Sequence, residues 1–388
     1  MPERLLIRNG VLALPSGLSR GDVLAEGRRI VAVGRGLVAD GARVFEADGL
    51  TVGPGFVDVH CHGGGGHSFF TRDISRVADY SAWAPRNGVT SYLISTCGRD
   101  DEDTTAIFRA LAQSIGGGPG AEPLGFHLEG PFINPLRNGA FPPNMLRPAA
   151  AWEFERYQEA AGGLIKQVTM APELPRALEL SRCIARSGAI PALGHTDATG
   201  EEARAGFAAG IRHVTHLFNA MRPIHHREGG PIVAALLEDA ATCELICDGA
   251  HLEPDALRMA YRVLGPSRTV VVTDNLHLAG MDATSGQFAG ETVQVSGAKA
   301  AKADGTIVGS VATMDQHFRN AVSFLGIDLP TAFRLCSANP ARVAGEQSRK
   351  GGLSHGMDAD LVLLDAQLRV QATVCRGELA YERPATTI

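Results

Sequence analysis

The stretch Gly55-Phe-Val-Asp-Val-His-Cys61 decides the fold, because it opens a series of short apolar segments that alternate with helical ones. Runs rich in apolar or β-branched residues recur from residue 51 onward, which is typical of repeated β–α units. Eight such runs over ~220 residues match a (β/α)₈ barrel in number and length. The strands are expected at residues 55–61, 89–96, 124–129, 166–171, 190–195, 213–218, 243–248 and 269–274.

The number of strands and a missing glycine motif distinguish the barrel from the alternative fold, a doubly wound sheet. Residues 201–209 and 254–264 have the periodicity of the expected helices. A doubly wound sheet also alternates strands and helices, but it needs fewer strands. No Gly-x-Gly-x-x-Gly sequence opens a helix after the first strand. The α/β barrel, similar to that of triosephosphate isomerase (TIM), is therefore the predicted fold.

The two ends of the chain have a different pattern. Residues 4–50 alternate apolar and polar side chains, with turn signals such as Asn9-Gly10, and residues 352–382 resume that alternation. Both ends are expected to form one small β-sandwich domain, made of residues 1–52 and 346–388. The barrel would then span residues 53–345.

Composition limits the class of protein. A chain of 388 residues is long enough for an enzyme-sized fold. Its 36 Lys and Arg residues against 42 Asp and Glu residues give a net charge of −6, so no nucleic-acid or anionic-membrane partner is expected. No apolar run reaches the ~18 residues of a membrane span, and the N-terminus lacks a signal-peptide core. Seven scattered cysteines favour reduced thiols and a cytoplasmic location.

Polar residues follow the predicted strands at their carboxyl ends, where barrel enzymes carry their active sites. His60 and His62 are two residues apart on a strand, so they point to the same side with ~6.6 Å between their Cα atoms. Taken singly, each polar residue also has a structural explanation, such as a buried salt bridge for Glu129. Taken together they converge on one barrel mouth: His60, His62, Glu129, His195, His216 and Asp274.

Four imidazoles and two carboxylates make a mixed nitrogen and oxygen ligand set. Such a set suits Zn²⁺, Fe²⁺ or a similar ion better than Mg²⁺ or Ca²⁺. The sequence therefore predicts a site for one or two divalent metal ions. His127 lies two residues before Glu129 and shares its face, so we expect it to orient that carboxylate.

Several longer motifs resemble the amidohydrolase superfamily, and within it the N-acetylglucosamine-6-phosphate deacetylases. The run that begins at His216 is far more specific than the His-x-His pair, which many amidohydrolases share. The motifs are Gly53-Pro-Gly-Phe-Val-Asp-Val-His-Cys-His-Gly-Gly-Gly-Gly, His127-Leu-Glu-Gly-Pro-Phe, Gly194-His-Thr-Asp-Ala, His216-Leu-Phe-Asn-Ala-Met-Arg-Pro-Ile-His-His-Arg-Glu, Cys247-Asp-Gly-Ala-His, Val272-Thr-Asp and Gly352-Leu-Ser-His-Gly-Met-Asp-Ala-Asp-Leu-Val.

The resemblance implies a role for each metal-side residue. Glu129, His195 and His216 would hold one ion, and the pair His60 and His62 would hold a second, with the glutamate shared. Asp274 would act first as a base toward water and then as an acid toward the leaving amine.

For the substrate end, the resemblance implies that the backbone at Asn219 and Ala220, together with Arg227 and His251, binds a sugar and its 6-phosphate. Arg227 could instead be a surface residue, and His251 a capping or core histidine. Related enzymes take one phosphate contact from a neighbouring subunit, which implies a homodimer.

One position departs from the family pattern. Members usually carry a substrate-contacting histidine shortly after the Glu-Gly-Pro segment, where this chain has Phe141. Phenylalanine donates no hydrogen bond. Either His277 or Asn138 supplies that contact, or the substrate differs there.

The leading hypothesis is hydrolysis of the N-acetyl amide of N-acetylglucosamine 6-phosphate, which yields glucosamine 6-phosphate and acetate in amino-sugar catabolism. The alternative within enzymes is deacetylation of N-acetylgalactosamine 6-phosphate or of an unphosphorylated N-acyl compound. A non-catalytic sugar-phosphate sensor is a third alternative, but such a binder has no need of Asp274.

Overall fold

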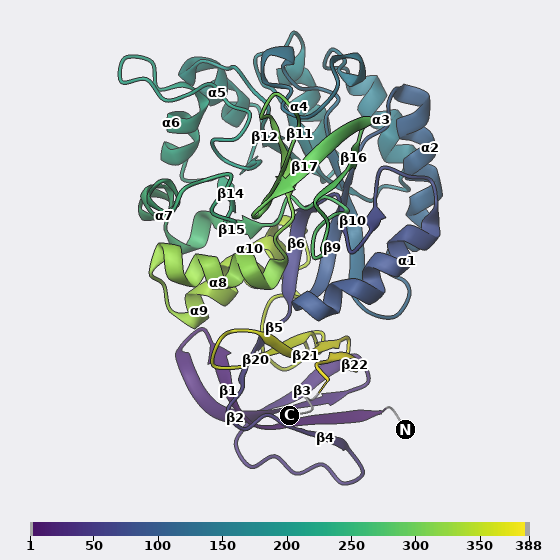
Figure 1. Ribbon diagram of the computed structural model, residues 1–388, viewed down its shortest axis with the longest axis vertical. Coiled ribbons are helices and arrows are strands. Elements are labelled where there is room, and N and C mark those ends of the chain that lie inside the picture. The colour runs from purple at the N-terminus through teal and green to yellow at the C-terminus, as the bar shows by residue number, and fades with distance from the viewer. Residues whose placement is uncertain (1–2, 385–388) are drawn as a thin grey trace.

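The computed structural model describes residues 3–384, and its centre is a barrel of eight parallel strands. The strands neighbour one another in chain order, as the sequence pattern predicts (Figure 1). They are β6 (Phe56–Cys61), β9 (Val89–Thr96), β10 (Glu122–Glu129), β11 (Ile165–Met170), β12 (Ile190–Leu193), β13 (His213–Val214), β14 (Thr242–Ile246) and β15 (Thr269–Val272).

The barrel is joined between β15 and β6 by a buried carboxylate and two backbone bonds. Asp58 Oδ2 accepts a hydrogen bond from Thr273 Oγ1 at 2.6 Å. Beyond that contact, Asp274 N donates to His60 O and His62 N donates to Asn275 O, each at 2.8 Å. These bonds fix the end of β6 against the segment that follows β15.

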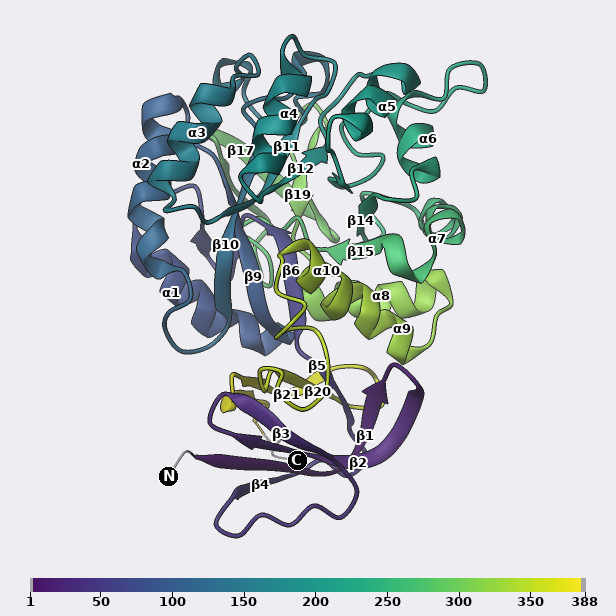
Figure 2. The same ribbon diagram turned by 180° about the vertical axis from the view of Figure 1, so that it is seen from behind.

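Helices cover the outside of the barrel (Figures 1 and 2). The helix α4 (Ala177–Arg186) illustrates why: Leu180, Cys183 and Ile184 lie on one face at helical spacing and are buried. The helix α5 (Gly200–Ala208) begins at Thr199, whose capping box with Glu202 satisfies backbone donors of the first turn. The other helices are α1 (Ile74–Trp83), α2 (Asp101–Leu111), α3 (Ala151–Ala160), α6 (Gly230–Leu237), α7 (Pro254–Arg268), α8 (Met314–Leu325), α9 (Leu329–Phe333) and α10 (Asn339–Val343).

Strands from both chain ends form one further sheet of eight strands at one end of the barrel, as expected (Figure 1). Their apolar side chains, among them Ile7, Val23, Leu361 and Val374, share a separate core. Two pairings were not expected, because β4 and β5 both run parallel to β1. The domain boundaries at residues 52 and 346 stay a prediction. The strands are β1 (Arg4–Leu14), β2 (Gly17–Glu26), β3 (Arg29–Gly34), β4 (Arg43–Glu46), β5 (Thr51–Pro54), β20 (Leu361–Leu364), β21 (Val370–Cys375) and β22 (Glu378–Glu382).

A four-stranded antiparallel sheet follows β15, and the sequence pattern did not predict it. Figure 1 shows β16 and β17 in front of the barrel strands. A shorter pair, β7 (Gly63–Gly64) and β8 (His67–Ser68), follows β6. The four strands are β16 (Ser285–Phe288), β17 (Glu291–Ser296), β18 (Lys299–Ala301) and β19 (Ile307–Ser310).

Two structural observations concern the expectations of reduced cysteines and of no membrane span. All seven cysteines lie within residues 3–384, and each is buried as a free thiol. Among the helices that the structure describes, none is both long and apolar enough to cross a membrane.

Candidate metal centre and active site

The predicted metal and catalytic residues lie at the carboxyl ends of five barrel strands. His195, His216 and Asp274 each lie two residues beyond a strand, with φ values of 48°, 28° and 51°. Non-glycine residues rarely adopt this left-handed conformation, and such strain is concentrated at functional sites. Here it turns the chain abruptly and brings the three side chains to the barrel mouth.

Two groups of ligating atoms result, each with its atoms within 4.8 Å of one another. His60, His62 and Asp274 form the first group, and Glu129, His195 and His216 form the second. Asp274 Oδ1 lies 3.4 Å from His60 Nε2 and 3.5 Å from His62 Nε2.

Glu129 lies between the two groups, and its Oε1 is also 3.3 Å from His60 Nε2 of the first group. Its Oε2 is 2.9 Å from His62 Nε2, and its Oε1 is 3.3 Å from His195 Nε2 and 3.2 Å from His216 Nε2. The carboxylate is therefore positioned to contact ions in both groups, as the resemblance implies.

The hydrogen bonds of the imidazoles determine which ring nitrogen is free. Backbone carbonyls only accept, so His62 Nδ1 donates to Ser95 O at 3.0 Å and His195 Nδ1 donates to Arg137 O at 2.8 Å. His60 Nδ1 lies 2.8 Å from Glu244 Oε2. In the neutral rings the Nε2 lone pairs then point into the site, which is the arrangement that metal-bound histidines adopt.

These residues fit a bound metal ion. His60 Nε2 is buried and has no hydrogen-bond partner, and the Nε2 atoms of His195 and His216 face each other at 3.1 Å. Because His195 Nδ1 donates to a carbonyl, its Nε2 lone pair lies 3.3 Å from the Glu129 carboxylate, and a cation between them would offset their repulsion. Imidazole and carboxylate ligands suit a divalent transition metal.

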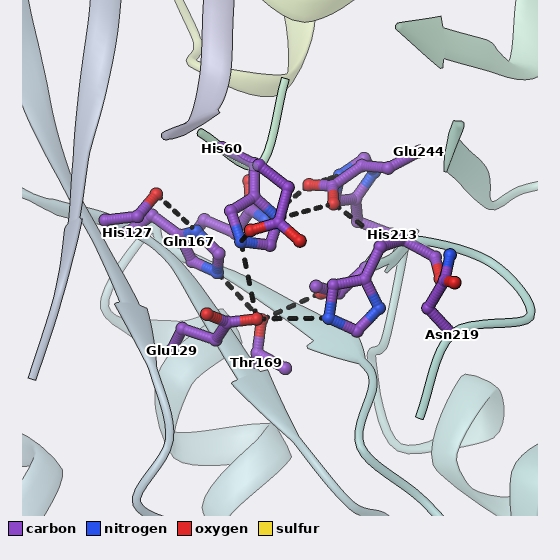
Figure 3. A network of polar contacts seen from close by, with 12 residues as sticks. His60, His127, Glu129, Gln167, Thr169, His213, Asn219 and Glu244 are labelled. Carbon is purple, nitrogen blue, oxygen red and sulfur yellow. Dashed lines mark hydrogen bonds and ion pairs between the residues drawn. The ribbon is translucent and has the colours of Figure 1, made fainter. Parts of the chain in front are cut away.

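The fully buried carboxylate of Glu244 holds the expected ligands through hydrogen bonds, a role that the sequence pattern did not predict. Glu244 accepts from His60 Nδ1, from His213 Nε2 and Gln167 Nε2 at 2.9 Å, and from the backbone N of His216 at 2.9 Å (Figure 3). It thus touches two expected ligands. Its position in the middle of a strand, between two cysteines, gave no signal of this role.

The prediction for His127 was wrong. Its Nδ1 contacts Ser95 Oγ at 2.9 Å and its Nε2 contacts Thr169 Oγ1 at 2.7 Å, so the ring has no nitrogen left for Glu129. His127 instead packs edge-on against the ring of His60, with 4.6 Å between the ring centroids. It holds the ring of His60 in place rather than the carboxylate of Glu129.

The electrostatics of the site keep its carboxylates ionised. Burial by itself raises the pKa of Glu129, Glu244 and Asp274, but the neighbouring imidazoles outweigh burial and lower each pKa below its ordinary value. Burial also lowers the pKa of His127 well below the ordinary value, so that ring is neutral. The site therefore contains ionised carboxylates, including that of Glu244, next to the neutral ring of His127.

A cavity of about 290 Å³ opens beside the two ligand groups. Asn219, Ala220 and His251 line it, as the resemblance implies, and His251 Nδ1 is held by Asp248 Oδ2 at 2.6 Å. Arg227 does not lie there: it is exposed and lines a different cavity, of about 410 Å³, beside α5 and α6. Within one chain, the structure brings together all the predicted site residues except Arg227.

The surroundings of Phe141 bear on the missing histidine. Phe141 lines the catalytic cavity, whereas neither Asn138 nor His277 does. The Asn138 side chain donates to the backbone oxygen of Phe141 at 2.6 Å, and His277 lines a neighbouring cavity. Substitution of the histidine contact by Asn138 or His277, or a different substrate group at this point, both stay predictions.

The fold and the paired ligand groups are those of a metal-dependent amide hydrolase, and the profile of the amidohydrolase family matches residues 51–380. The chain belongs to the amidohydrolase family and is a hydrolase that acts on an amide. It is similar to the N-acetylglucosamine-6-phosphate deacetylase of Bacillus subtilis, with 38% identity over 332 residues that cover 84% of each chain.

Two further relatives bear on the substrate. The N-acetylgalactosamine-6-phosphate deacetylase of Escherichia coli is 34% identical over 87% of this chain and 89% of its own. A mutant N-acetyl-D-glucosamine-6-phosphate deacetylase from Mycobacterium smegmatis, solved in complex with N-acetyl-D-glucosamine-6-phosphate, has a TM-score of 0.91 and 35% identity. That comparison covers 97% of this chain and 99% of the other.

Proposed function

We propose that this protein hydrolyses the N-acetyl amide of N-acetylglucosamine 6-phosphate, releasing acetate and glucosamine 6-phosphate in amino-sugar catabolism. The observation that carries the proposal is the position of Asp274 beside both histidines of the first ligand group, at the edge of a cavity that Asn219 and His251 also line. Relatives that carry this activity cover most of the chain.

Asp274 performs the proton transfers in this reaction. Its carboxylate takes a proton from the attacking water and then delivers it to the amine nitrogen as the carbon–nitrogen bond breaks. The barrel holds Asp274 for this task, because its backbone N donates to His60 O at 2.8 Å and its backbone O accepts from Ser310 N at 2.9 Å.

Glu129, His195 and His216 would hold one divalent ion, and His60 and His62 with the shared Glu129 would hold a second. A bound ion lowers the pKa of water and polarises the amide carbonyl. We propose two ions per chain, zinc or iron, because oxygens hold the Nδ1 atoms of His60, His62 and His195, which leaves a ring Nε2 for an ion in each group.

Asn219, the backbone of Ala220 and His251 would bind the sugar phosphate within one chain. Arg227 is exposed outside that cavity, and we propose that it reaches the phosphate bound by a partner subunit in a homodimer. The buried free thiols agree with a cytoplasmic enzyme.

The test is acetate release from N-acetylated sugars, with and without a 6-phosphate, at defined metal content. The proposal expects the highest kcat/KM for N-acetylglucosamine 6-phosphate and a large loss without the phosphate. Equal rates for the phosphorylated and unphosphorylated sugars would contradict the proposed substrate.

N-acetylgalactosamine 6-phosphate is the second candidate substrate, and the similarity to the E. coli enzyme favours it. The two sugars differ only at the C4 hydroxyl. Comparing their kcat/KM values in the same panel decides between them.

A further inference from the structure

An apolar wall beside the catalytic cavity consists of Phe141 and Phe288, which line the cavity, and Phe70, which packs between Phe288 and His62. The ring of Phe70 stacks on His62, with 5.1 Å between centroids and 15° between planes. The ring of Phe141 packs edge-on against His195 at 5.5 Å, and Phe288 packs against Phe70 at 5.5 Å. The apolar wall therefore borders an imidazole from each ligand group.

The same cavity also has polar lining residues. Asn219 and His251 line it and offer hydrogen bonds that suit a sugar phosphate. If the proposed function holds, the scissile carbonyl lies next to the ligand groups, the amine and sugar contact these polar residues, and the acyl chain contacts Phe141 and Phe288.

A second cavity of about 620 Å³ lies directly behind this wall. Phe141 and Phe288 line both cavities, so their rings form the boundary between them. Cys97, Ile107 and Met145 line the second cavity but not the first, and all three are buried.

The charged groups at the edge of the second cavity are already paired. Arg99 Nε lies 3.4 Å from Asp103 Oδ2, and the Arg99 side chain is 83% exposed. The pair leaves no net charge for an anionic ligand to bind. The interior offers mainly apolar contact, which favours a hydrocarbon chain.

We propose that the second cavity is an acyl-chain subsite and that the enzyme hydrolyses amino-sugar phosphates with N-acyl chains longer than acetyl. The acyl chain of the substrate passes the rings of Phe141 and Phe288 and ends against Ile107 and Met145. Water adds its oxygen to the acyl carbon, the carbon–nitrogen bond breaks, and Asp274 delivers the proton to the amine. The products are a short fatty acid and the amino-sugar phosphate. This proposal rests on the proposed deacetylase function.

The inference also accounts for Phe141. A histidine at this position would place a polar ring at the entrance of an apolar cavity, at a desolvation cost. A phenyl ring removes that cost, and each methylene buried behind it favours binding by about fourfold.

The experiment measures formation of the free amino-sugar phosphate from N-acetyl, N-propionyl, N-butyryl and N-hexanoyl glucosamine 6-phosphate. The protein is the full-length metal-loaded chain. We expect kcat/KM for the butyryl substrate to stay within about tenfold of that for the acetyl substrate, because the cavity receives the added methylenes. A larger loss would overturn the subsite and leave the deacetylase function standing. No amine from any substrate would overturn the deacetylase function itself.

Variants of Met145 test whether the acyl chain of the substrate lies in the second cavity. Met145→Trp fills the second cavity and should lower the butyryl-to-acetyl ratio tenfold or more, whereas the volume-conserving Met145→Leu should keep it within threefold of wild type. Because each ratio compares two substrates on the same preparation, partial loss of folded protein cancels. An unchanged ratio in Met145→Trp would overturn the assignment.

A second variant tests the boundary independently. Phe141→Ala widens the passage between the two cavities and should raise the hexanoyl-to-acetyl ratio, since the ring no longer narrows it. A ratio that falls or stays constant would contradict the proposed path.

Discussion

At the scale of single residues, some side chains of the site contact the reacting groups, and others hold those side chains in position. Asp274 and three histidines, His62, His195 and His216, line the cavity. Carbonyl or carboxylate oxygens fix the rings of His60, His62 and His195. Because the two roles belong to different residues, substitutions can change turnover and metal binding separately.

Asp274→Asn should reduce kcat by about a thousandfold or more, because an amide can neither take nor deliver the proton. The ion of the second group should stay bound, since its ligands Glu129, His195 and His216 are intact. Steady-state kinetics and elemental analysis of the same preparation measure both effects. Turnover close to wild type would remove Asp274 from the mechanism.

Glu244→Gln should reduce the metal bound per chain, because the amide supplies one acceptor oxygen where His60, His213, Gln167 and the His216 backbone need two. Support of this kind typically contributes 10-fold to 100-fold in metal affinity. Titration with a chelator, followed by metal analysis, measures the loss.

Two further variants calibrate the Glu244 measurement. His195→Ala removes an expected ligand and sets the lower limit of metal content. Glu153→Gln changes a buried glutamate on α3 and should bind metal as the wild type does. If Glu244→Gln matches Glu153→Gln, Glu244 has no part in holding the ligands.

At the scale of elements, the sequence predicted what local periodicity controls. All eight barrel strands begin within two residues of the predicted positions, and both example helices are present, because apolar runs and helical spacing are local properties. The strands predicted at 190–195, 213–218, 243–248 and 269–274 end two to four residues earlier. The sheet β16–β19 was missed, since its strands are short and since β16 and β17 are largely exposed. Glu244 and the parallel pairing of β4 and β5 were missed because they depend on contacts between distant segments.

Strand β19 reaches the active site through a glycine. Gly309 has a φ of +151°, and a Cβ there would lie 2.8 Å from the backbone oxygen of Asp274 and 3.1 Å from Leu276 Cγ. Gly309→Ala should therefore displace β19 or Asp274 and lower kcat by about tenfold to a hundredfold. Kinetics with saturating metal test this expectation.

Gly305→Ala is the matched control for Gly309→Ala. Gly305 also has a positive φ, of +88°, but nothing lies within 4 Å of its Cβ position. If both variants lose the same activity, the cause is backbone strain rather than contact with Asp274.

At the scale of the whole molecule, a cluster of buried charges joins the barrel to the end sheet. Lys350 Nζ lies 2.6 Å from Glu122 Oε2 at the start of β10 and 2.5 Å from Asp360 Oδ2 beside β20. Arg349 contacts both Glu122 and Asp358. Breaking one partner of such a cluster is costly, because it leaves the others buried and unpaired.

The pKa of Glu122 predicts how this cluster responds to acid. Burial alone raises this pKa, but hydrogen bonds and charge from Arg349 and Lys350 outweigh it and lower it from 4.5 to about 2. The contribution is therefore present above pH 4.5 and is lost as the pH falls toward 2. Glu122→Gln should destabilise the protein by on the order of 2 kcal/mol at pH 7, and the difference from wild type should shrink below pH 4.5.

Urea unfolding at several pH values measures this difference. The exposed Glu201, changed to Gln, is the control and should alter stability little at any pH. A Glu122→Gln effect that is constant from pH 7 to pH 3 would show that the ionised carboxylate is not what stabilises the junction.

The shared sheet of the two chain ends has a consequence for synthesis on the ribosome. Strand β5 pairs with β1 on one side and with β20 on the other, so the edge of β5 stays open until residues 361–364 have left the exit tunnel. A nascent chain that stops early keeps an unpaired strand and an incomplete core. The order of translation therefore makes completion of the end sheet a late event, and truncated chains present an edge that quality-control proteases and chaperones can detect.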